Sequence, residues 1–294
     1  MLKSIERIIC CLAMILTVTV GAGAQSLNLD AQVRAEAAKF KGKVSLFAKN
    51  LDTGATYSFG ADDRVRTAST IKVPIMVEAF ARVAEGRAKW TDELVLTDAK
   101  KVGGSGILPE FAGGLRLTLR DAVHLMIVLS DNTATNLVLD ALSTDAVNAR
   151  MDALGLKQTR LLRKVFGGGT SKAGEDPELK KYGLGVSTPR EMVTLLEKIE
   201  RGEVVSPAAS REMIAILKRE QDGKNIGRAL KGVEMATKSG ALDRLRSDVG
   251  IVYSKRGRIA MAITCDDMPE IDWTVDNPGH LLLSRLSLLL IDKL

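Results

Sequence analysis

The order of strand and helix patterns along the chain constrains its fold more than any other feature of the sequence. Apolar residues alternate with more polar ones from Lys43 to Asn50, and a turn at 52–54 leads to a returning strand from Ala55 to Phe59. Near the other end, Val249 to Tyr253 and Ile259 to Thr264 flank a polar turn. Because the pattern between these hairpins is helical, the sequence predicts an α/β (α+β) fold. We expect one antiparallel sheet, flanked by helices and built from both termini, with an inserted all-α lobe.

Helix start and stop signals support this division. Thr188-Pro189-Arg190-Glu191 is a capping box with proline at the first helical position, and Gly202 ends the helix that it begins. Asn277 and Pro278 open a largely apolar closing helix, and another helix is expected near 29–40. We therefore predict an α/β sandwich lobe over 25–66 plus 214–294 and an all-α lobe over 67–213.

The first 24 residues have the pattern of a signal peptide. Lys3 and Arg7 precede an apolar run from Ile8 to Val20, and Ala22-Gly23-Ala24 follows as a cleavage site. The alternative is an uncleaved anchor, but the run is shorter than the ~20 residues of a spanning helix. We predict a periplasmic or secreted protein with no stable membrane anchor. Cleavage leaves one cysteine, Cys265, which is expected to be a strand thiol with no internal disulfide.

Composition disfavours several classes of function. The 42 Lys and Arg residues are scattered, and aromatic residues make up only 4% of the chain, so nucleic acid is a poor candidate partner. The two histidines, His124 and His280, are too few for a histidine-rich zinc site and disfavour a serine–histidine triad. We expect no metal and no cofactor. A monomer is expected because no exposed amphipathic stripe is left over.

A lysine can replace histidine as the base of a serine hydrolase when its surroundings lower its pKa. The chain contains one such pair, Ser69-Thr70-Ile71-Lys72, at the start of the helical repeat Val73 to Val83. If a helix begins there, the amine lies one turn from the hydroxyl on the same face. The alternative for this motif alone is a serine N-cap followed by a solvated lysine.

Two further motifs strengthen the functional interpretation. Ser130-Asp131-Asn132 falls between two predicted helices, and Lys238-Ser239-Gly240 ends a strand-like segment over 233–237. Alone, the first is typical of a helix cap and the second of a turn. The three motifs in this order, on a helix start, an interhelical loop and a strand end, are typical of serine β-lactamases and penicillin-binding proteins.

With these motifs, nearly the whole chain after the leader resembles the class A β-lactamase family. The segments Gly103 to Leu108, Ser130 to Asn136 and Ser187 to Arg190 are also similar to segments of that family. The resemblance implies a sandwich lobe holding both termini, an all-α lobe and a cleft at their seam. It implies β-lactam small molecules as substrates, with cell-wall peptides as a further possibility.

The resemblance also implies roles for individual residues. Ser69 is expected to attack the lactam carbonyl, Lys72 to take its proton and Ser130 to protonate the departing nitrogen. The backbone N–H groups of Ser69 and Ala241 are expected to form an oxyanion hole. The substrate is expected to contact the following residues: Asn132 at its side-chain amide, Lys238 and Ser239 at its carboxylate, and Gly240 and Ser105 along the cleft.

The segment expected to supply the deacylating base departs from the family pattern. That pattern is Glu-x-x-Leu-Asn, and the nearest match here is Asp176-Pro177-Glu178-Leu179-Lys180, preceded by Glu175. Glu175, Asp176 or neither is therefore the base. Three hypotheses follow: an exported β-lactamase acting through a Ser69 acyl-enzyme, a penicillin-binding DD-peptidase or serine esterase with slow deacylation, and a binder of lactam or cell-wall ligands that does not turn over.

Overall fold

The computed structural model describes residues 28–294, and the predicted signal peptide and its cleavage site lie outside the described residues. Five antiparallel strands form the main sheet in the order β2-β1-β10-β9-β8. Their bounds are Thr56–Phe59 for β2, Lys43–Asn50 for β1, Gly257–Asp266 for β10, Leu245–Ser254 for β9 and Glu234–Leu242 for β8. Leu46 of β1 lies opposite Ile263 of β10. The prediction of one antiparallel sheet built from both ends of the chain is confirmed.

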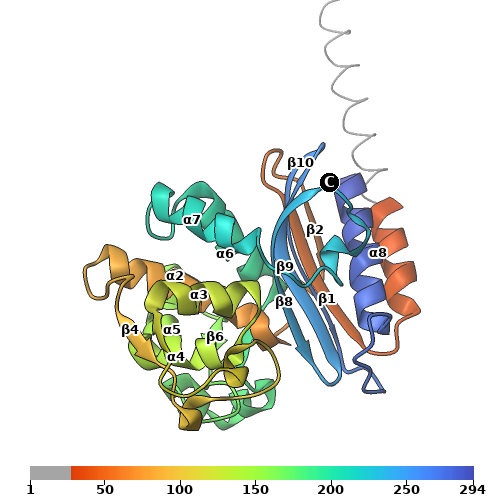
Figure 1. Cartoon of the computed structure of the whole chain (residues 1–294). Helices are drawn as coiled ribbons and strands as arrows, with labels where there is room; N and C mark the ends of the chain where they lie inside the picture. The colour runs from red at the N-terminus through yellow and green to blue at the C-terminus, as the bar shows by residue number, and fades with distance from the viewer. Residues whose placement is uncertain (1–27) are drawn as a thin grey trace, which may run out of the picture.

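Helices cover both faces of this sheet (Figure 1). One face packs against α8 (Pro278–Lys293) and the helix over 28–38, and its core contains Met261, Ile263 and Leu286. The other face packs against α6 (Pro189–Arg201) and presents Phe47, Ala260 and Ala262 to the larger core. The alternation of strand side chains thus assigns bulky residues of β10 to the α8 side and alanines to the α6 side.

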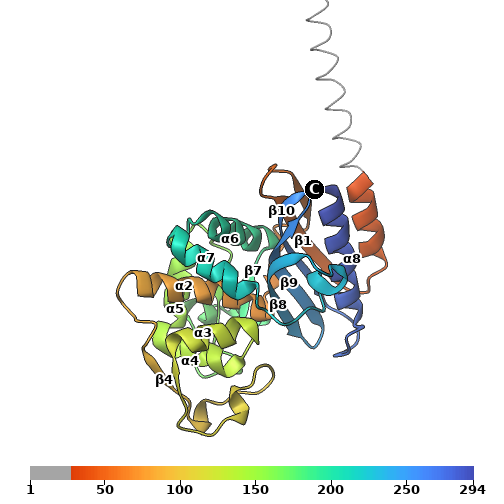
Figure 2. The same cartoon turned by 45° about the horizontal axis from the view of Figure 1, so that its top comes forward.

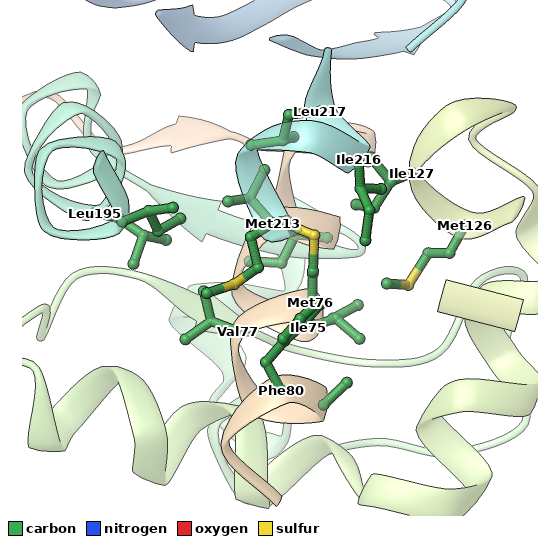
Figure 3. Packing of buried hydrophobic residues seen from close by; sticks show 14 of the residues in the cluster. Ile75, Met76, Val77, Phe80, Met126, Ile127, Leu195, Met213, Ile216 and Leu217 are labelled. Atoms are coloured by element: carbon green, nitrogen blue, oxygen red, sulfur yellow. The ribbon is translucent and has the colours of Figure 1, made fainter. Parts of the chain in front are cut away.

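The helical part of the molecule is built around α2 (Lys72–Ala84). Ten consecutive residues of α2, from Lys72 to Ala81, are buried, which is the pattern of a helix enclosed on all sides. Figure 3 shows side chains of α2, such as Met76 and Phe80, among those of α3 (Leu119–Val128), α6 and α7 (Pro207–Leu217). Helices α4 (Asn132–Leu142) and α5 (Thr144–Ala153) pack against the remaining sides.

Short strands and 3-10 helices lie between the longer helices and the main sheet (Figure 2). One small sheet has the order β3-β7-β6, and β4 pairs with β5. The remaining bounds are β3 (Val65–Arg66), β4 (Glu93–Val95), β5 (Arg116–Thr118), β6 (Arg160–Leu161), β7 (Gly185–Ser187), η1 (Ala68–Ile71), η2 (Asp98–Lys100), η3 (Leu108–Glu110), η4 (Lys172–Glu175), η5 (Pro177–Tyr182) and η6 (Ile226–Ala229). Residue 214, a predicted lobe boundary, lies inside α7, which packs against both α3 and β8.

The predicted helix boundaries agree with the structure at several points. Thr188 caps α6, Gly202 ends it in the left-handed conformation, and Asn277 caps α8. Two local details differ from the sequence interpretation. Helix α2 begins at Lys72, so Ser69 lies in the preceding 3-10 turn η1, and β8 continues to Leu242, so Lys238-Ser239-Gly240 lies inside the strand.

Candidate active site

A cavity of about 1010 Å³ lies between the β8 edge of the sheet and the helical part. The 3-10 helix η1 packs directly against β8 at this position. The cavity brings together residues of all three sequence motifs: Ser69, Ser130, Asn132, Ser239, Gly240, Ala241, and also Ser105. Lys72 and Lys238 have no exposed surface. The fold therefore places the sequence-predicted serines around one cavity and buries the two predicted lysines.

The environment of Lys72 explains how it can act on a serine. Its Nζ donates to the carbonyl oxygen of Ser130 at 2.7 Å and to Oδ1 of Asn132 at 2.9 Å, and Ser130 Oγ lies at 3.2 Å. Burial lowers the pKa of Lys72 well below its ordinary value, and the nearby positive charge of Lys238 lowers this pKa further. An uncharged amine has two N–H donors and one lone pair. In that form, with the donors used on Ser130 and Asn132, the lone pair of Lys72 is free to accept a hydroxyl proton.

The loop between α3 and α4 is fixed by a buried aspartate. Asp131 Oδ1 accepts from the backbone N–H of Ala134 at 2.7 Å and caps α4, while its Oδ2 accepts from the N–H groups of Ile107 and Leu108 at 2.7 and 2.8 Å. Ser130 has a positive φ of 53°, a strained conformation for a residue with a side chain. Asp131 thus joins two loops that border the cavity and holds Ser130 between them.

Asn132 and Ser105 lie next to each other at this border. The Asn132 side chain donates to the carbonyl oxygen of Gly103 at 2.9 Å, and its backbone N–H donates to the carbonyl oxygen of Ser105 at 2.9 Å. Ser105 Oγ in turn donates to the carbonyl oxygen of Leu129 at 3.2 Å. One side-chain N–H of Asn132 is therefore left to face a ligand.

The close approach of β8 to η1 requires a glycine at position 240. A Cβ on Gly240 would lie 2.8 Å from the carbonyl oxygen of Thr67 and 3.1 Å from the backbone nitrogen of Ser69. The backbone of β8 therefore lies against the backbone of the serine turn. This contact brings the strand that carries Ala241 beside the Ser69 N–H, the arrangement on which a two-donor oxyanion hole depends.

Lys238 and Ser239 have an internal carboxylate partner, Glu220, which sequence reasoning did not select. Ser239 Oγ donates to Glu220 Oε1 at 2.7 Å, and both Lys238 Nζ and the Ser239 backbone N–H lie 3.4 Å from the same oxygen. The Glu220 side chain is 2% exposed. In the sequence, Glu220 belongs to the charged run Lys218 to Asp222, which has the composition of a solvated loop. No local pattern distinguishes Glu220, because only the tertiary fold brings it to β8.

A second buried carboxyl group lies beside this cluster. Asp248 of β9 is the register partner of Ser239, and its Oδ2 accepts from the backbone N–H of Ile226 at 3.2 Å. Its Oδ1 has no hydrogen-bond partner. Burial raises the pKa of Asp248 well above its ordinary value, and the negative charge of Glu220 raises this pKa further. Both effects favour the protonated form of Asp248.

The two candidate deacylating bases lie away from the cavity. Glu175 and Asp176 are exposed, and neither is among the residues that line the cavity. Asp176 Oδ1 accepts from the backbone N–H of Glu178 at 2.9 Å and caps η5. The segment over 163–184 instead contributes these residues to the cavity: Arg163, Val165, Phe166, Gly183 and Leu184. None of them has a carboxyl group.

The two histidines and the cysteine make contacts that belong to the fold. His124 Nδ1 contacts the carbonyl oxygen of Arg120 one turn earlier. His280 is buried, borders the cavity and bonds to Arg246 and Asn225. Cys265 is a buried strand residue, and burial raises the pKa of its thiol. Over 28–294, no group of three or more His, Cys, Asp and Glu side chains has a metal-site arrangement, and no helix is long and apolar enough to cross a membrane.

The sheet built from both termini, the enclosed helix α2 and the cavity with its serines and lysines define a two-part α/β protein of the β-lactamase and penicillin-binding-protein type. Residues 28–294 match the model of the beta-lactamase enzyme family. The chain belongs to this family, and that membership supports a hydrolase.

Individual relatives agree with this assignment. The chain is 27% identical to beta-lactamase 3 of Bacillus cereus over 223 residues, which are 73% of this chain and 66% of that protein, just under two thirds of its length. Among solved structures, it superposes on a beta-lactamase from Sphaerobacter thermophilus with a TM-score of 0.77 and 30% identity, covering 89% of this chain and 94% of the other. The chain also superposes on the structure of PBP-A with a TM-score of 0.79 and 28% identity, covering 90% of this chain and 95% of PBP-A.

Proposed function

We propose that this chain is a serine enzyme that opens the β-lactam amide through an acyl-enzyme on Ser69. The observation that carries the proposal is the buried Lys72 amine, whose pKa is lowered and whose donors are held by Ser130 and Asn132. A similar structure, a PBP-A variant, is described as an acyl-enzyme complex with penicillin G. Family membership and this likeness both favour β-lactams as acyl donors.

In the proposed acylation, a bond forms between Ser69 Oγ and the lactam carbonyl carbon while the proton of Ser69 moves to Lys72. The C–N bond then breaks, and Ser130 gives its proton to the departing nitrogen. The contact of Ser130 Oγ with Lys72 Nζ at 3.2 Å lets Lys72 return a proton to Ser130. The net transfer is one proton from Ser69 to the ring nitrogen. Two backbone donors at the carbonyl oxygen contribute several kcal/mol of transition-state stabilisation.

Release of the acyl group distinguishes the leading proposal from its alternative. Deacylation needs a water and a base within hydrogen-bond reach. Because Glu175 and Asp176 are exposed and lie outside the cavity lining, the structure favours a slow second step. This observation supports the alternative of a penicillin-binding peptidase or esterase with a long-lived acyl-enzyme, or of a binder that does not turn over.

The remaining parts of the proposal rest on sequence. We place the protein in the periplasm or outside the cell after cleavage of the leader at Ala24, as a monomer, with no metal or cofactor. We also propose a division into lobes over 25–66 plus 214–294 and over 67–213.

Intact-protein mass spectrometry tests the proposal. Wild-type protein is mixed with penicillin G, and the mass is followed over time together with the absorbance of the lactam. We expect an adduct of lactam mass on Ser69, absent in Ser69→Ala and retained in the control Ser58→Ala, which changes an exposed serine of β2. An adduct in Ser69→Ala contradicts the proposed nucleophile. Clearance of the adduct supports the β-lactamase, and persistence supports the slow alternative.

A further inference from the structure

Ser239 and Glu220 line one part of the cavity, with the Lys238 side chain buried behind them, and we call these three residues the Lys238 subsite. An inference about this subsite deepens the proposed function, on which it rests, by naming the chemical class of substrate. Lys238 and Ser239 are the two residues expected to bind a substrate carboxylate. In the structure, the carboxylate of Glu220 already contacts both of them.

The negative charge of the Lys238 subsite belongs to Glu220. Its Oε1 accepts from Ser239 Oγ and lies near Lys238 Nζ, and its Oε2 accepts from the backbone N–H of Asp222 at 2.9 Å. Asp248 has one backbone donor and an oxygen with no partner. The Glu220 carboxylate is therefore the one surrounded by donors and next to an ammonium group, whereas Asp248 has a single backbone donor. Glu220 therefore neutralises Lys238.

Glu220 is also held in place. The segment after α7 that carries it is tied to α3, because the backbone N–H of Gln221 donates to the carbonyl oxygen of Val128 at 3.1 Å. The Glu220 side chain is buried, with a different partner on each oxygen. A ligand carboxylate entering the subsite would have to displace this side chain or lie beside it. The second arrangement places like charges close together in a buried site, which is strongly unfavourable.

The hydrogen-bonding groups left over suit an uncharged ligand. The single proton of Ser239 Oγ is donated to Glu220, so its lone pairs remain as acceptors. Lys238 Nζ donates to Glu220 Oε1 and to the carbonyl oxygen of Ser239 at 3.0 Å, and it has no exposed surface, so it offers no donor to a ligand in the cavity. The acceptor on Ser239 is the complement of the N–H of a carboxamide, whereas a carboxylate has no proton to donate to it.

The wall beside the subsite is apolar. Trp273 and Ile271 are 61% and 57% exposed and both line the cavity. The Trp273 ring lies 4.6 Å from the guanidinium carbon of Arg246, which is the register partner of Ala241. The Arg246 guanidinium itself donates to backbone carbonyl groups of Leu242, Leu245 and Asp272 and to His280. Its N–H donors are therefore used within the protein, and its outer neighbour is an aromatic face.

We infer that Glu220 is a specificity-determining residue that makes the Lys238 subsite select acyl substrates with an uncharged carboxamide where β-lactams usually carry a carboxylate. The side of the substrate that leaves with the nitrogen is then neutral and contacts Trp273 and Ile271. The natural substrate class is an amide or ester whose leaving part has no free carboxylate.

A matched pair of ligands tests this inference. Penicillin G and its carboxamide, in which only the carboxylate is changed, are compared by the second-order rate of Ser69 acylation. We expect the wild-type protein to react roughly 10-fold or more faster with the carboxamide. In Glu220→Gln, which keeps the side-chain shape and removes the charge, the ratio should shift by a similar factor toward the carboxylate. If the wild-type protein is acylated faster by the carboxylate, the inference is overturned. This outcome is measured on the wild-type protein alone, so it does not depend on whether a variant folds.

The matched control is Asp222→Asn, which removes a carboxylate from the same cavity without touching Lys238 or Ser239. Its ratio should stay within about two-fold of wild type, and a shift as large as that of Glu220→Gln overturns the inference in favour of a general charge effect. Dissociation constants of both ligands for Ser69→Ala, measured by calorimetry, separate this inference from the proposed function. If Ser69→Ala binds the carboxamide more tightly but neither ligand acylates the wild-type protein, Ser69 is rejected as the nucleophile and the inferred specificity is kept. If the wild-type protein is acylated but Ser69→Ala binds the carboxylate more tightly, the nucleophile is kept and the inferred specificity is rejected.

Discussion

Replacement of Asp131 by alanine provides a quantitative test of how the cavity border is held. The side chain has no exposed surface and accepts three backbone N–H groups, from Ile107, Leu108 and Ala134, at 2.7–2.8 Å. Hydrogen bonds to a charged group contribute about 1.5–3 kcal/mol each, and loss of an N-cap costs about 1 kcal/mol. Because these bonds share one side chain and are not additive, we expect Asp131→Ala to lower the free energy of unfolding by about 4 kcal/mol.

Thermal unfolding followed by circular dichroism checks this value. For a chain of this size, about 1 kcal/mol corresponds to about 2 °C, so Tm should fall by about 8 °C. The matched control is Asp121→Ala, which removes another helix-capping carboxylate, in the exposed capping box with Thr118. It should cost less than about 1 kcal/mol. If the two variants unfold within about 1 kcal/mol of each other, burial of Asp131 does not have the importance argued from its hydrogen bonds.

Two further predictions concern pH and backbone packing. Burial and the charge of Arg246 lower the pKa of His280 to about 4, so between about pH 6.5 and 4 the unfolded chain binds a proton that the folded chain does not. The free energy of unfolding should therefore fall as pH drops through this range. In urea titrations, His280→Gln should lose about 2 kcal/mol less of this free energy than wild type between the two pH values. Equal losses in the two proteins would contradict the lowered pKa of His280. Gly240→Ala places a methyl group 2.8 Å from the carbonyl oxygen of Thr67 and should slow Ser69 acylation about 100-fold. Gly223→Ala, whose Cβ meets nothing within 4 Å, is the control, and equal acylation rates in the two variants would refute the steric argument.

Much of the fold was predictable because local signals and tertiary structure agree. The capping box at Thr188 and the proline after Asn277 begin helices where hydrogen bonds to the caps are observed. Strand alternation from Lys43 to Asn50 assigns side chains to two faces, and both faces are buried by helices. Each of these patterns depends on residues a few positions apart, so it can be recognised without knowing the rest of the structure.

The electrostatics of the cavity were not predictable in the same way. The pKa of Lys72 depends on burial by several helices and on Lys238, which lies far along the chain. Glu220 contacts β8 through a loop whose sequence is that of a solvated surface. For Glu175 and Asp176, spacing alone left the base open, and the irregular loop places both side chains outside the cavity lining. Charge and loop conformation depend on the complete fold, whereas periodicity does not.

The pairing of β1 with β10 has a consequence for how this chain reaches its folded state. The partners are roughly 200 residues apart in sequence, so the closure of a very long loop must precede the central pairing of the sheet. During synthesis, β1 and β2 can form only a two-stranded hairpin, which is marginally stable in water, until β10 has been made. The edge of β1 that pairs with β10 therefore stays unpaired until nearly the whole chain exists, and a chain that ends before β10 exposes a strand edge that is prone to aggregation.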